Sequence, residues 1–450
     1  MSKRAMGRAS FLVILIAAAV VFSVAMQRSG YAGSKYEELA TFNNVLSIVE
    51  KNYVEPVDDK KLIEGAIQGM LASLDPHSNF LDADTFKEMQ VETKGSFGGL
   101  GIEITVRDGY ITVVSPITGT PAYRVGIQSG DKIIKIEGKS TKNMSLIEAV
   151  KLMRGPKGTK ITITIFREGM TRPEDYTIVR DVVKIQSVRS KILEDGYGYV
   201  KVASFQERTQ QDLDKALKNF RGDGDLRGLV LDLRNNPGGL LDQAIKVSNT
   251  FLDGGLIVYT DGRIESQKMR FEATKGADEA DYPMVVLVNG GSASASEIVA
   301  GALQDHRRAL ILGTKTFGKG SVQTIIPLEG GSGLRLTTAH YFTPNGGSIQ
   351  AKGIVPDIVV RPDEYKAPGE SGDADIFSLR EEDLEGHLLN PDGEAAPEKK
   401  KEKKKEAPKA RPLDPRAVYG DPATDVQLAR ALELLKSWQV FEALVRNDAS

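Results

Sequence analysis

Residues 289–297 have the sequence Asn-Gly-Gly-Ser-Ala-Ser-Ala-Ser-Glu and lie between two apolar segments. The preceding run, 284–288, predicts a buried strand, and the following run, 298–303, predicts a helix. The serines therefore fall at a strand-to-helix turn, where the first N–H groups of the helix are unpaired and its dipole is positive. A serine oxygen at such a turn has an oxyanion site beside it, although serines at helix starts are also common caps.

A second motif, Thr-Phe-Gly-Lys-Gly-Ser-Val-Gln at residues 316–323, places Lys319 between two glycines. A lysine in such a loop is either a phosphate-binding residue or a buried base. Residues 313–319 fit the spacing of a phosphate-binding loop, but Gly320 stands where that loop needs serine or threonine. The segment that follows also alternates like a strand, whereas a phosphate-binding loop leads into a helix. The motif therefore favours a buried base.

Together the two motifs resemble those of the C-terminal processing peptidases, also called tail-specific proteases, and the resemblance extends from about residue 36 to 360. In that family the middle serine is the nucleophile, the lysine is the general base, and a glutamine four residues later orients the lysine. The resemblance implies that these roles fall to Ser294, Lys319 and Gln323. It also implies an α/β (α+β) fold, in which a mixed β/α protease core carries an inserted PDZ domain and helical N- and C-terminal segments.

The residue types suit this chemistry. Serine is a weak nucleophile unless a base takes its proton. A free lysine with a pKa of about 10.4 is too basic for that task, but burial can lower the pKa to roughly 7–8. A glutamine oxygen can aim the lysine amine without adding charge. Catalysis by histidine is disfavoured, because the four histidines accompany no Gly-x-Ser-x-Gly elbow.

The loop at residues 234–239, Arg-Asn-Asn-Pro-Gly-Gly, follows an apolar strand-like run and resembles a family loop that supplies a backbone N–H for the oxyanion. The resemblance assigns that N–H to Gly238 or Gly239, alongside the N–H of Ala295. A Pro-Gly-Gly turn required only by sterics is the alternative, and the two roles are compatible. Asp305 resembles a family aspartate that affects activity, and support of the fold is the favoured role.

Residues 95–180 contain a glycine loop, alternating strands and a short helix that resemble a PDZ domain. In that family the loop binds a peptide's terminal carboxylate through backbone N–H groups, and the peptide adds a strand to the sheet. A small β-rich domain without a ligand is the alternative. Arg154 either couples peptide binding to the active site or faces solvent. The residues implied in peptide binding are Gly99, Leu100, Gly101 and Ile102.

Composition limits the partners. The 450 residues carry 59 basic and 61 acidic side chains, so no basic field predicts nucleic-acid binding. The sequence has no cysteine, which excludes thiol catalysis and disulfides. We expect neither a metal nor a cofactor. The expected partners are protein substrates with free C-termini.

The N-terminal residues 1–30 predict a secretory signal peptide or an uncleaved signal anchor. Lys3, Arg4 and Arg8 precede an apolar run at 11–26. Either interpretation places the rest of the chain in the periplasm or another extracytoplasmic space, and an uncleaved segment would anchor it to the inner membrane.

The region 31–94 predicts helices at 35–53 and from about 58 to 74. The first is amphipathic, and the family resemblance implies that such helices help to form a homodimer.

The protease core is expected at 181–365, followed by a low-complexity linker at 366–420 and a C-terminal helix at 421–450. The helix carries an apolar stripe, which must bury against its own core or a second subunit.

These observations predict a serine endopeptidase that cleaves protein substrates near their C-termini through an acyl-enzyme, with the substrate tail bound by the PDZ domain. The main alternative is a catalytically inactive PDZ scaffold that binds peptides in the cell envelope. An acyl-CoA-type hydrolase is a third interpretation, but it gives the PDZ domain no obvious use.

Overall fold

The computed structural model shows a chain of two compact units, residues 1–73 and 74–450. The structure describes residues 36–447 except for 195, 223, 225, 276–281, 363–378 and 393–419. The predicted signal segment and most of the predicted linker lie outside the described residues. No helix within the described part of the chain has both the length and the apolar character needed to cross a membrane.

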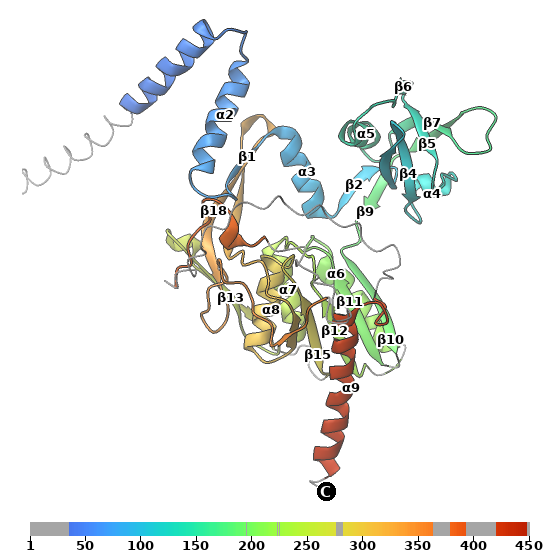
Figure 1. Ribbon diagram of the computed structural model, residues 1–450, viewed down its shortest axis with the longest axis vertical. Coiled ribbons are helices and arrows are strands. Elements are labelled where there is room, and N and C mark those ends of the chain that lie inside the picture. The colour runs from blue at the N-terminus through green and yellow to red at the C-terminus, as the bar shows by residue number, and fades with distance from the viewer. Residues whose placement is uncertain are drawn as a thin grey trace, which may run out of the picture. The chain divides into compact units, whose positions relative to one another are not determined.

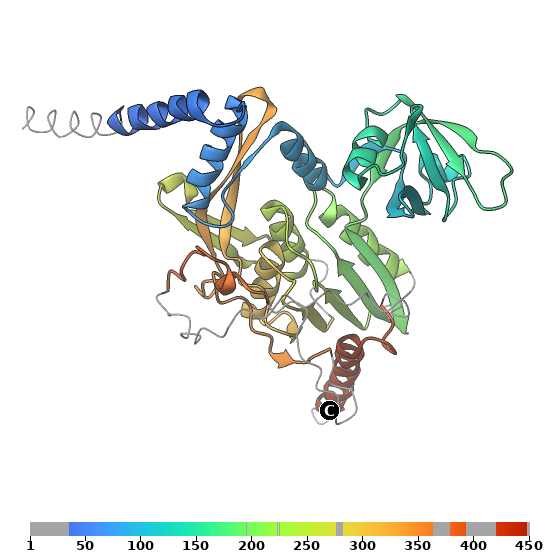
Figure 2. The ribbon, with the colours of Figure 1, turned by 45° about the horizontal axis from the view of Figure 1, so that its top comes forward.

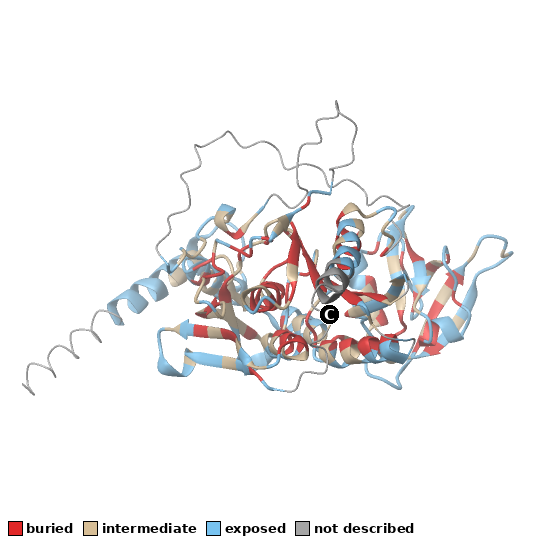
Figure 3. Cartoon of the chain, turned by 90° about the horizontal axis from the view of Figure 1, so that it is seen from below, coloured by how far each residue is buried: buried red, intermediate tan, exposed pale blue. Residues whose placement is uncertain are grey.

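The first unit contains two helices, one over residues 36–52 and α2 (Asp59–Ala72), as the apolar periodicity predicts. Asp58 caps α2 by accepting from the N–H groups of Lys60 and Lys61. Figure 3 shows the first helix exposed along its length, and the side chains of Leu39 and Phe42 are exposed.

The core of the second unit is a six-stranded sheet in the order β10-β11-β12-β15-β16-β19. The β10–β11 pair is antiparallel, and every other neighbouring pair is parallel. Parallel strands are buried on both faces, which explains their continuous apolar runs. The strands are β10 (Val188–Glu194), β11 (Tyr197–Val202), β12 (Gly228–Asp232), β15 (Met284–Val288), β16 (Leu310–Gly313) and β19 (Ile358–Val359).

Helices cover both faces of this sheet (Figure 1). Leu229 and Leu231 of β12 point to the face covered by α6 (Thr209–Gly222), α7 (Leu241–Phe251) and α8 (Ala295–Asp305). Val230, between them, points to the other face, which is covered by α9 (Val426–Asn447). The apolar stripe of the C-terminal helix therefore buries against its own core through Leu428, Ala431, Leu432 and Leu435.

A second sheet lies at the side of the core and carries the long β17–β18 hairpin, drawn in orange in Figure 2. Its order is β1-β18-β13-β14, with β17 also paired to β18. The strands are β1 (Asn79–Leu81), β13 (Gly255–Gly262), β14 (Met269–Ala273), β17 (Ser321–Pro327) and β18 (Gly333–Phe342), with 3-10 turns η1 (Glu265–Gln267) and η2 (Glu329–Gly331). Helix α3 (Ala83–Lys94) follows β1.

The segment after α3 forms a separate β-rich module with its own apolar core. Its sheet has the order β3-β4-β5-β7-β8, so β3 is an edge strand. The elements are β3 (Ile102–Arg107), β4 (Tyr110–Pro116), α4 (Pro121–Arg124), β5 (Lys132–Ile136), β6 (Lys139–Ser140), α5 (Leu146–Met153), β7 (Lys160–Phe166) and β8 (Glu174–Val179). The strands β2 (Ser96–Gly99) and β9 (Asp181–Lys184) pair where the chain enters and leaves the module.

The mixed α/β class predicted from the sequence is confirmed. One segment differs from the prediction: residues 379–392 fall inside the predicted linker, yet they contain the 3-10 turn η3 (Glu381–Asp383) and contact the core. Glu381 is completely buried. The charged run that suggested a linker lies farther along the chain, outside the described residues.

Candidate active site

Three loops of the core meet at one edge of the parallel sheet. The first, 234–239, follows β12; the second, 289–294, follows β15; and the third, 314–320, follows β16. These strands are neighbours and parallel, so their carboxyl ends lie at the same edge. That edge is where open α/β sheets bind ligands.

Ser294 occupies the sharp turn between β15 and α8. Its backbone has φ 54° and ψ −113°, an unfavourable conformation for a residue with a Cβ atom. Such strain is typical of functional turns, because the surrounding structure must hold it in place. The Ser294 side chain makes no capping hydrogen bond, so the simple helix-cap interpretation is not supported.

The two flanking serines have structural roles. Ser292 is completely buried, and its hydroxyl donates to the Leu233 carbonyl oxygen at 2.8 Å. Ser296 is completely buried as well, and its hydroxyl donates to the Asn236 carbonyl oxygen at 2.9 Å. Ser294 is only half-buried. Among the three serines, Ser294 is therefore the one placed to meet a substrate.

Glu297 is completely buried in the first turn of α8. It joins the loop at 289–294, here called the serine turn, to the loop at 314–320, here called the lysine loop. Its Oε2 atom accepts from the Ser294 N–H at 2.8 Å and from the Lys319 N–H at 2.9 Å. Its Oε1 atom accepts from the Thr316 hydroxyl at 2.6 Å and from the Gly318 N–H at 2.7 Å. The backbones of the predicted nucleophile and base thus converge on one oxygen atom. Burial raises the pKa of Glu297 to about 7 against the opposing effect of these four donors.

The environment of Lys319 suits a general base. Burial lowers the pKa of its amine, because the charged form loses hydration. The positive charge of Arg335 lowers this pKa further, whereas the carboxylates of Glu381 and Asp75 act in the opposite direction. The neutral amine that the chemistry requires is thereby favoured.

Gln323 presents a buried acceptor near this loop. Its amide nitrogen donates to the Thr337 hydroxyl at 2.9 Å and to the Ser321 hydroxyl at 3.2 Å. Its Oε1 atom is buried and has no hydrogen-bond partner among the described residues. A buried acceptor without a donor is costly, and a lysine amine could satisfy it.

A turn that begins with Asp75 supports Gln323 through the Thr337 hydroxyl, which Gln323 also contacts. The Thr337 hydroxyl donates to Asp75 at 3.1 Å, and the Ser78 hydroxyl donates to Asp75 at 2.7 Å. Burial opposes ionisation of Asp75, but hydrogen bonds from Ser78, His77 and Thr337 together lower its pKa.

The segment 379–392 holds the lysine loop in place. Arg380 donates to the carbonyl oxygens of Lys315 and Thr316 at 3.0 and 2.8 Å. Gln350 donates to Glu381 at 3.0 Å and accepts from the Gly320 N–H at 3.0 Å.

Glu381 also connects this segment to the Asp75 turn. The Nε2 atom of His77 lies 2.8 and 2.9 Å from the two carboxylate oxygens of Glu381. His77 therefore has a structural role.

The loop at 234–239, here called the oxyanion loop after its predicted role, contacts the serine turn directly. The Asn236 carbonyl oxygen accepts from the Ala293 N–H at 3.0 Å. Gly238 packs so closely that an added Cβ would lie 2.9 Å from the Ser294 Cβ. Because Ala295 is the first residue of α8, its N–H has no acceptor within the helix.

The two glycines proposed for the oxyanion are not equivalent. The Gly238 N–H donates to the Asn236 side chain at 2.9 Å. No described hydrogen bond uses the N–H of Gly239. The Gly239 N–H therefore lacks the bond within the loop that occupies the Gly238 N–H.

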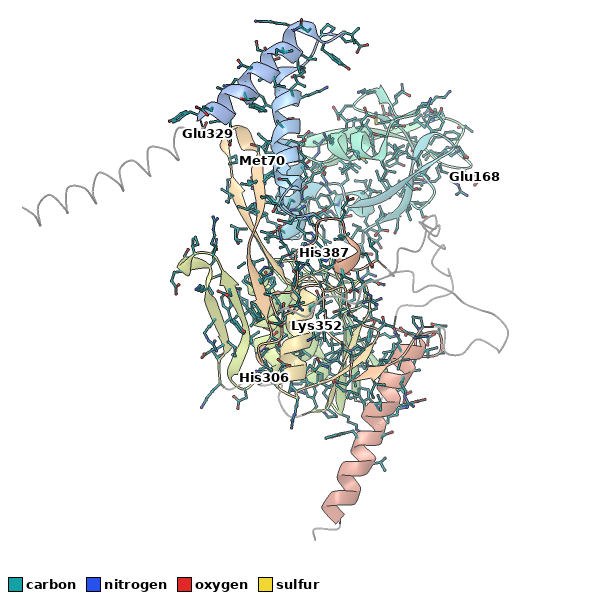
Figure 4. The ribbon with its side chains drawn as sticks, turned by 60° about the vertical axis from the view of Figure 1, so that its left-hand side comes forward. Met70, Glu168, His306, Glu329, Lys352 and His387 are labelled. Carbon is teal, nitrogen blue, oxygen red and sulfur yellow. The ribbon has the colours of Figure 1, made fainter. Side chains whose placement is uncertain are left out.

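Two other polar residues near α8 are structural. Asp305 accepts from the Asn345 N–H at 2.8 Å, as expected for a residue that supports the fold. His306, labelled in Figure 4, ends α8, and its Nε2 atom lies 2.7 Å from the Leu256 carbonyl oxygen. Among the described residues, no group of three or more metal-binding side chains could hold an ion.

The glycine loop of the β-rich module is held in place by hydrogen bonds that its backbone carbonyl groups accept. The Leu100 carbonyl oxygen accepts from the Ala122 N–H at 3.0 Å, and the Gly101 carbonyl oxygen accepts from the Ile117 N–H at 2.9 Å. Gly101 has φ 76°, which favours glycine. Gly99 and Leu100 are buried, and Ile102 begins the edge strand β3 beside α5.

Arg154 lies at the end of α5, and its guanidinium stacks over the ring of Phe97 at 4.7 Å from the ring centroid. Phe97 belongs to β2, at the entrance to the module. Arg154 is half-buried, so it does not simply face solvent.

Sequence reasoning assigned no role to Glu297 or Glu381. The Ser294-x-x-Glu297 spacing is that of a capping box and could have indicated a bond back to the Ser294 N–H. No local signal identifies Glu381, because its partners His77 and Gln350 are distant in sequence.

Comparison with known proteins matches three regions of the chain to known families. The sequence profile of peptidase family S41 matches residues 196–360, and the PDZ domain profile matches 88–166. A third profile, the activating protease CtpB N-terminal domain, matches 17–85.

Full-length relatives are also similar. A carboxy-terminal-processing protease of Bartonella bacilliformis is 50% identical over 89% of this chain and 89% of its own. The carboxy-terminal processing protease CtpA of Bacillus subtilis is 38% identical over 80% of this chain and 78% of its own. Among solved structures, the photosystem II D1 C-terminal processing protease is 32% identical, covers 72% of this chain and 92% of its own, and has a TM-score of 0.42.

The fold and the matching profiles define a serine-type peptidase with a PDZ domain. Because the identity to full-length relatives is high over most of both chains, the chain belongs to the carboxy-terminal processing proteases of peptidase family S41. The inactive-scaffold alternative is therefore not favoured.

Proposed function

We propose that the peptidase works through a Ser–Lys dyad in which Ser294 is the nucleophile and Lys319 is the general base. The observation that carries this proposal is the shared acceptor, because the N–H groups of both residues donate to Oε2 of Glu297. Local strain at Ser294 and the lowered pKa of Lys319 support the same assignment.

In the proposed reaction, the Lys319 amine takes the hydroxyl proton while the Ser294 oxygen attacks the scissile carbonyl carbon. The N–H groups of Gly239 and Ala295 stabilise the oxyanion that forms. The lysine then gives its proton to the departing amine, which leaves an acyl-enzyme. The same lysine then takes a proton from water, which attacks the ester carbonyl carbon, and it gives that proton to the Ser294 oxygen as the acid product leaves. The Gln323 oxygen accepts from the lysine and fixes its direction.

We further propose that the PDZ domain selects substrates by their C-terminal tail. The edge strand β3 can pair with an extended peptide, and the glycine loop at its start can offer N–H groups to a terminal carboxylate. The exposed apolar side chains of Leu146 and Ile147 on α5 suit an apolar terminal residue. The enzyme would then act as an endopeptidase near the C-termini of protein substrates.

A matched set of unstructured protein substrates tests the proposal. The members share one cut region and differ only in a free apolar terminus, an amidated terminus or an added Asp-Asp. Amidation removes a charged acceptor and Asp-Asp places charge in an apolar pocket, so kcat/KM should fall for both. Equal kcat/KM values would show that the tail is not selected. A Ser294→Ala variant that still cleaves would refute the dyad.

We propose that the chain acts outside the cytoplasm, held to the membrane by residues 11–26. The basic residues before this apolar run support that orientation. Cell fractionation of the full chain, compared with a chain lacking residues 1–30, tests the proposal. Recovery of the full chain in the cytoplasm would contradict it.

We also propose a homodimer formed through the N-terminal helices. The exposed apolar side chains of Leu39, Phe42 and Ile48 support a partner surface, because such residues favour burial. Sedimentation of the protein and of a Leu39→Gln/Phe42→Gln variant tests this, and the variant should be monomeric. A monomeric wild type at micromolar concentration would contradict the proposal.

A further inference from the structure

The first residues of the C-terminal helix contact the oxyanion loop, although they lie beyond the region that matches the peptidase family profile. Both carboxylate oxygens of Asp425 accept from Arg234, at 2.6 Å from Nη2 and 2.9 Å from Nη1. The Gln427 Oε1 atom accepts from Nη1 at 2.9 Å. Figure 1 shows α9 starting beside the sheet near β12.

Arg234 also binds a second carboxylate, that of Asp232. Its Nε and Nη2 atoms donate to the two carboxylate oxygens of Asp232 at 3.0 and 2.7 Å. Asp232 is completely buried and accepts from Tyr199 and Lys201 as well. Burial opposes the charge on Asp232, but the charge and hydrogen bonds of Arg234 hold its pKa at about 2. The guanidinium is thus fixed between two carboxylates, one from β12 and one from the start of α9.

Arg234 is the first residue of the oxyanion loop, so its position affects the residues that follow. The Asn235 N–H donates to Asn289 at 2.9 Å, and the Asn289 amide donates back to Asn235 at 2.7 Å. Asn236 then binds the serine turn, because its carbonyl oxygen accepts from Ser296. Three consecutive residues therefore link the start of α9, the end of β15 and the start of α8.

Helix α9 is held firmly enough to act as a fixed support. Gln427 donates to the Val360 carbonyl oxygen at 2.8 Å. The side chains of Leu428, Leu432 and Leu435 are buried in the core cluster under the sheet. These contacts set where Asp425 and Gln427 stand, independently of their bonds to Arg234.

We propose that Asp425 and Gln427 are positioning residues that hold Arg234, and through it the oxyanion loop, in the arrangement needed for catalysis. The C-terminal helix would then complete the active site within the same chain. This inference rests on the proposed function, because it concerns the loop that carries the Gly239 N–H. It predicts an effect on the transition state with little effect on substrate binding.

Asp425→Asn separates this role from helix capping. Asp425 also accepts from the Leu428 N–H at 3.0 Å, and asparagine caps a helix about as well as aspartate. The substitution therefore keeps the cap but removes the charge that pairs with Arg234. Glu433→Gln, which breaks an exposed pair with Arg430 on the same helix, is the matched control.

The test uses the full chain with an unstructured protein substrate and a peptide aldehyde, which forms a tetrahedral adduct with the active-site serine. Asp425→Asn should lower kcat by at least about tenfold with KM within about threefold, because misplaced catalytic groups slow the chemical step. Its affinity for the aldehyde should fall by a similar factor. Glu433→Gln should match the wild type in both measurements. Thermal unfolding checks that each variant is folded.

Wild-type kcat and aldehyde affinity in a folded Asp425→Asn variant would overturn the inference. If that variant does not fold, Gln427→Ala provides the second test: it removes the Oε1 acceptor of Arg234 and should lower kcat with KM within about threefold. A folded Gln427→Ala variant with wild-type kcat would overturn the inference as well. Ser294→Ala, assayed in parallel, reports on the proposed function alone, because activity in that variant would refute the dyad whatever Asp425→Asn does.

Discussion

Replacing Glu297 by glutamine tests how the serine turn and the lysine loop are held together. The wild-type carboxylate receives four donors, two on each oxygen, from Ser294, Thr316, Gly318 and Lys319. A glutamine keeps the shape but has one oxygen and one NH2 group. Whichever way the amide is turned, its NH2 faces groups that were donors.

The less costly orientation can be worked out from the contacts. If the NH2 group takes the place of Oε1, the Thr316 hydroxyl can rotate to accept from it, but the Gly318 N–H loses its acceptor and the Thr316 O–H loses the Glu297 acceptor. A buried donor left without a partner costs about 1–3 kcal/mol. Since about 1.4 kcal/mol corresponds to a tenfold change in rate, kcat should fall by about 5- to 150-fold if the whole cost affects the catalytic arrangement.

The effect should depend on pH. Burial raises the pKa of Glu297 from 4.5 to about 7, so the wild type loses its charged acceptor as the pH falls below about 7 and then resembles the variant. The ratio of wild-type to variant kcat should therefore be larger at pH 8.5 than at pH 6. The raised pKa also means that protonation favours the folded state, so the wild-type free energy of unfolding should decrease as the pH rises from 4.5 through about 7. The glutamine variant should lack this dependence.

The assay measures kcat and KM for an unstructured protein substrate at both pH values, with thermal unfolding in parallel. Glu265→Gln is the control, because that side chain is exposed and pairs with Lys268 at the surface. A folded Glu297→Gln variant with kcat within threefold of wild type at pH 8.5 would refute the idea that this carboxylate aligns the dyad. A ratio that does not change with pH would refute the role assigned to its charge.

Three further predictions concern single residues. Ser294→Ala should abolish cleavage, whereas Ser292→Ala and Ser296→Ala should keep it and lose about 1 kcal/mol of stability for each hydrogen bond removed. The Ser296 hydroxyl donates to Asn236, and the Ser292 hydroxyl donates to Leu233 and accepts from the Asn289 N–H, so Ser292→Ala should be the more destabilising; thermal unfolding and cleavage assays distinguish these outcomes. Arg335→Met should raise the pKa of Lys319 by removing a nearby positive charge, so the acid limb of the pH–rate profile should move to higher pH, and an unmoved limb would contradict the electrostatic argument. Gly238→Ala should lower kcat by about 100-fold or more, because the added Cβ would lie 2.8 Å from the Ala293 carbonyl oxygen in a backbone with φ 104°; Gly222→Ala, whose Cβ meets nothing within 4 Å, should be silent.

Much of the architecture could be predicted from the sequence because it depends on local pattern. The apolar run 284–288 and the helix pattern after it place the serine turn without knowledge of any other segment. The alternation in the β-rich module and the stripe on the C-terminal helix are local in the same way. The motif residues Ser294 and Lys319 were identifiable for a related reason, since each lies in a short stretch whose composition is unusual.

The tertiary structure decided which serine hydroxyls and loop N–H groups are already hydrogen-bonded within the protein. The three serines of the motif stand at alternate positions in one short run, but only the folded chain buries Ser292 and Ser296 against the carbonyl groups of Leu233 and Asn236. The Gly238 N–H is taken by Asn236, which no glycine pattern indicates.

The tertiary structure also decided which distant segments support the site. Glu297 joins loops that are separate in sequence, Glu381 joins His77 to Gln350, and Asp425 meets Arg234 across most of the core domain. Local pattern reports whether a side chain is buried, because burial of a helix face or strand face follows a period. It does not report the partner, because a buried charge is satisfied by whichever opposite group the chain topology brings beside it.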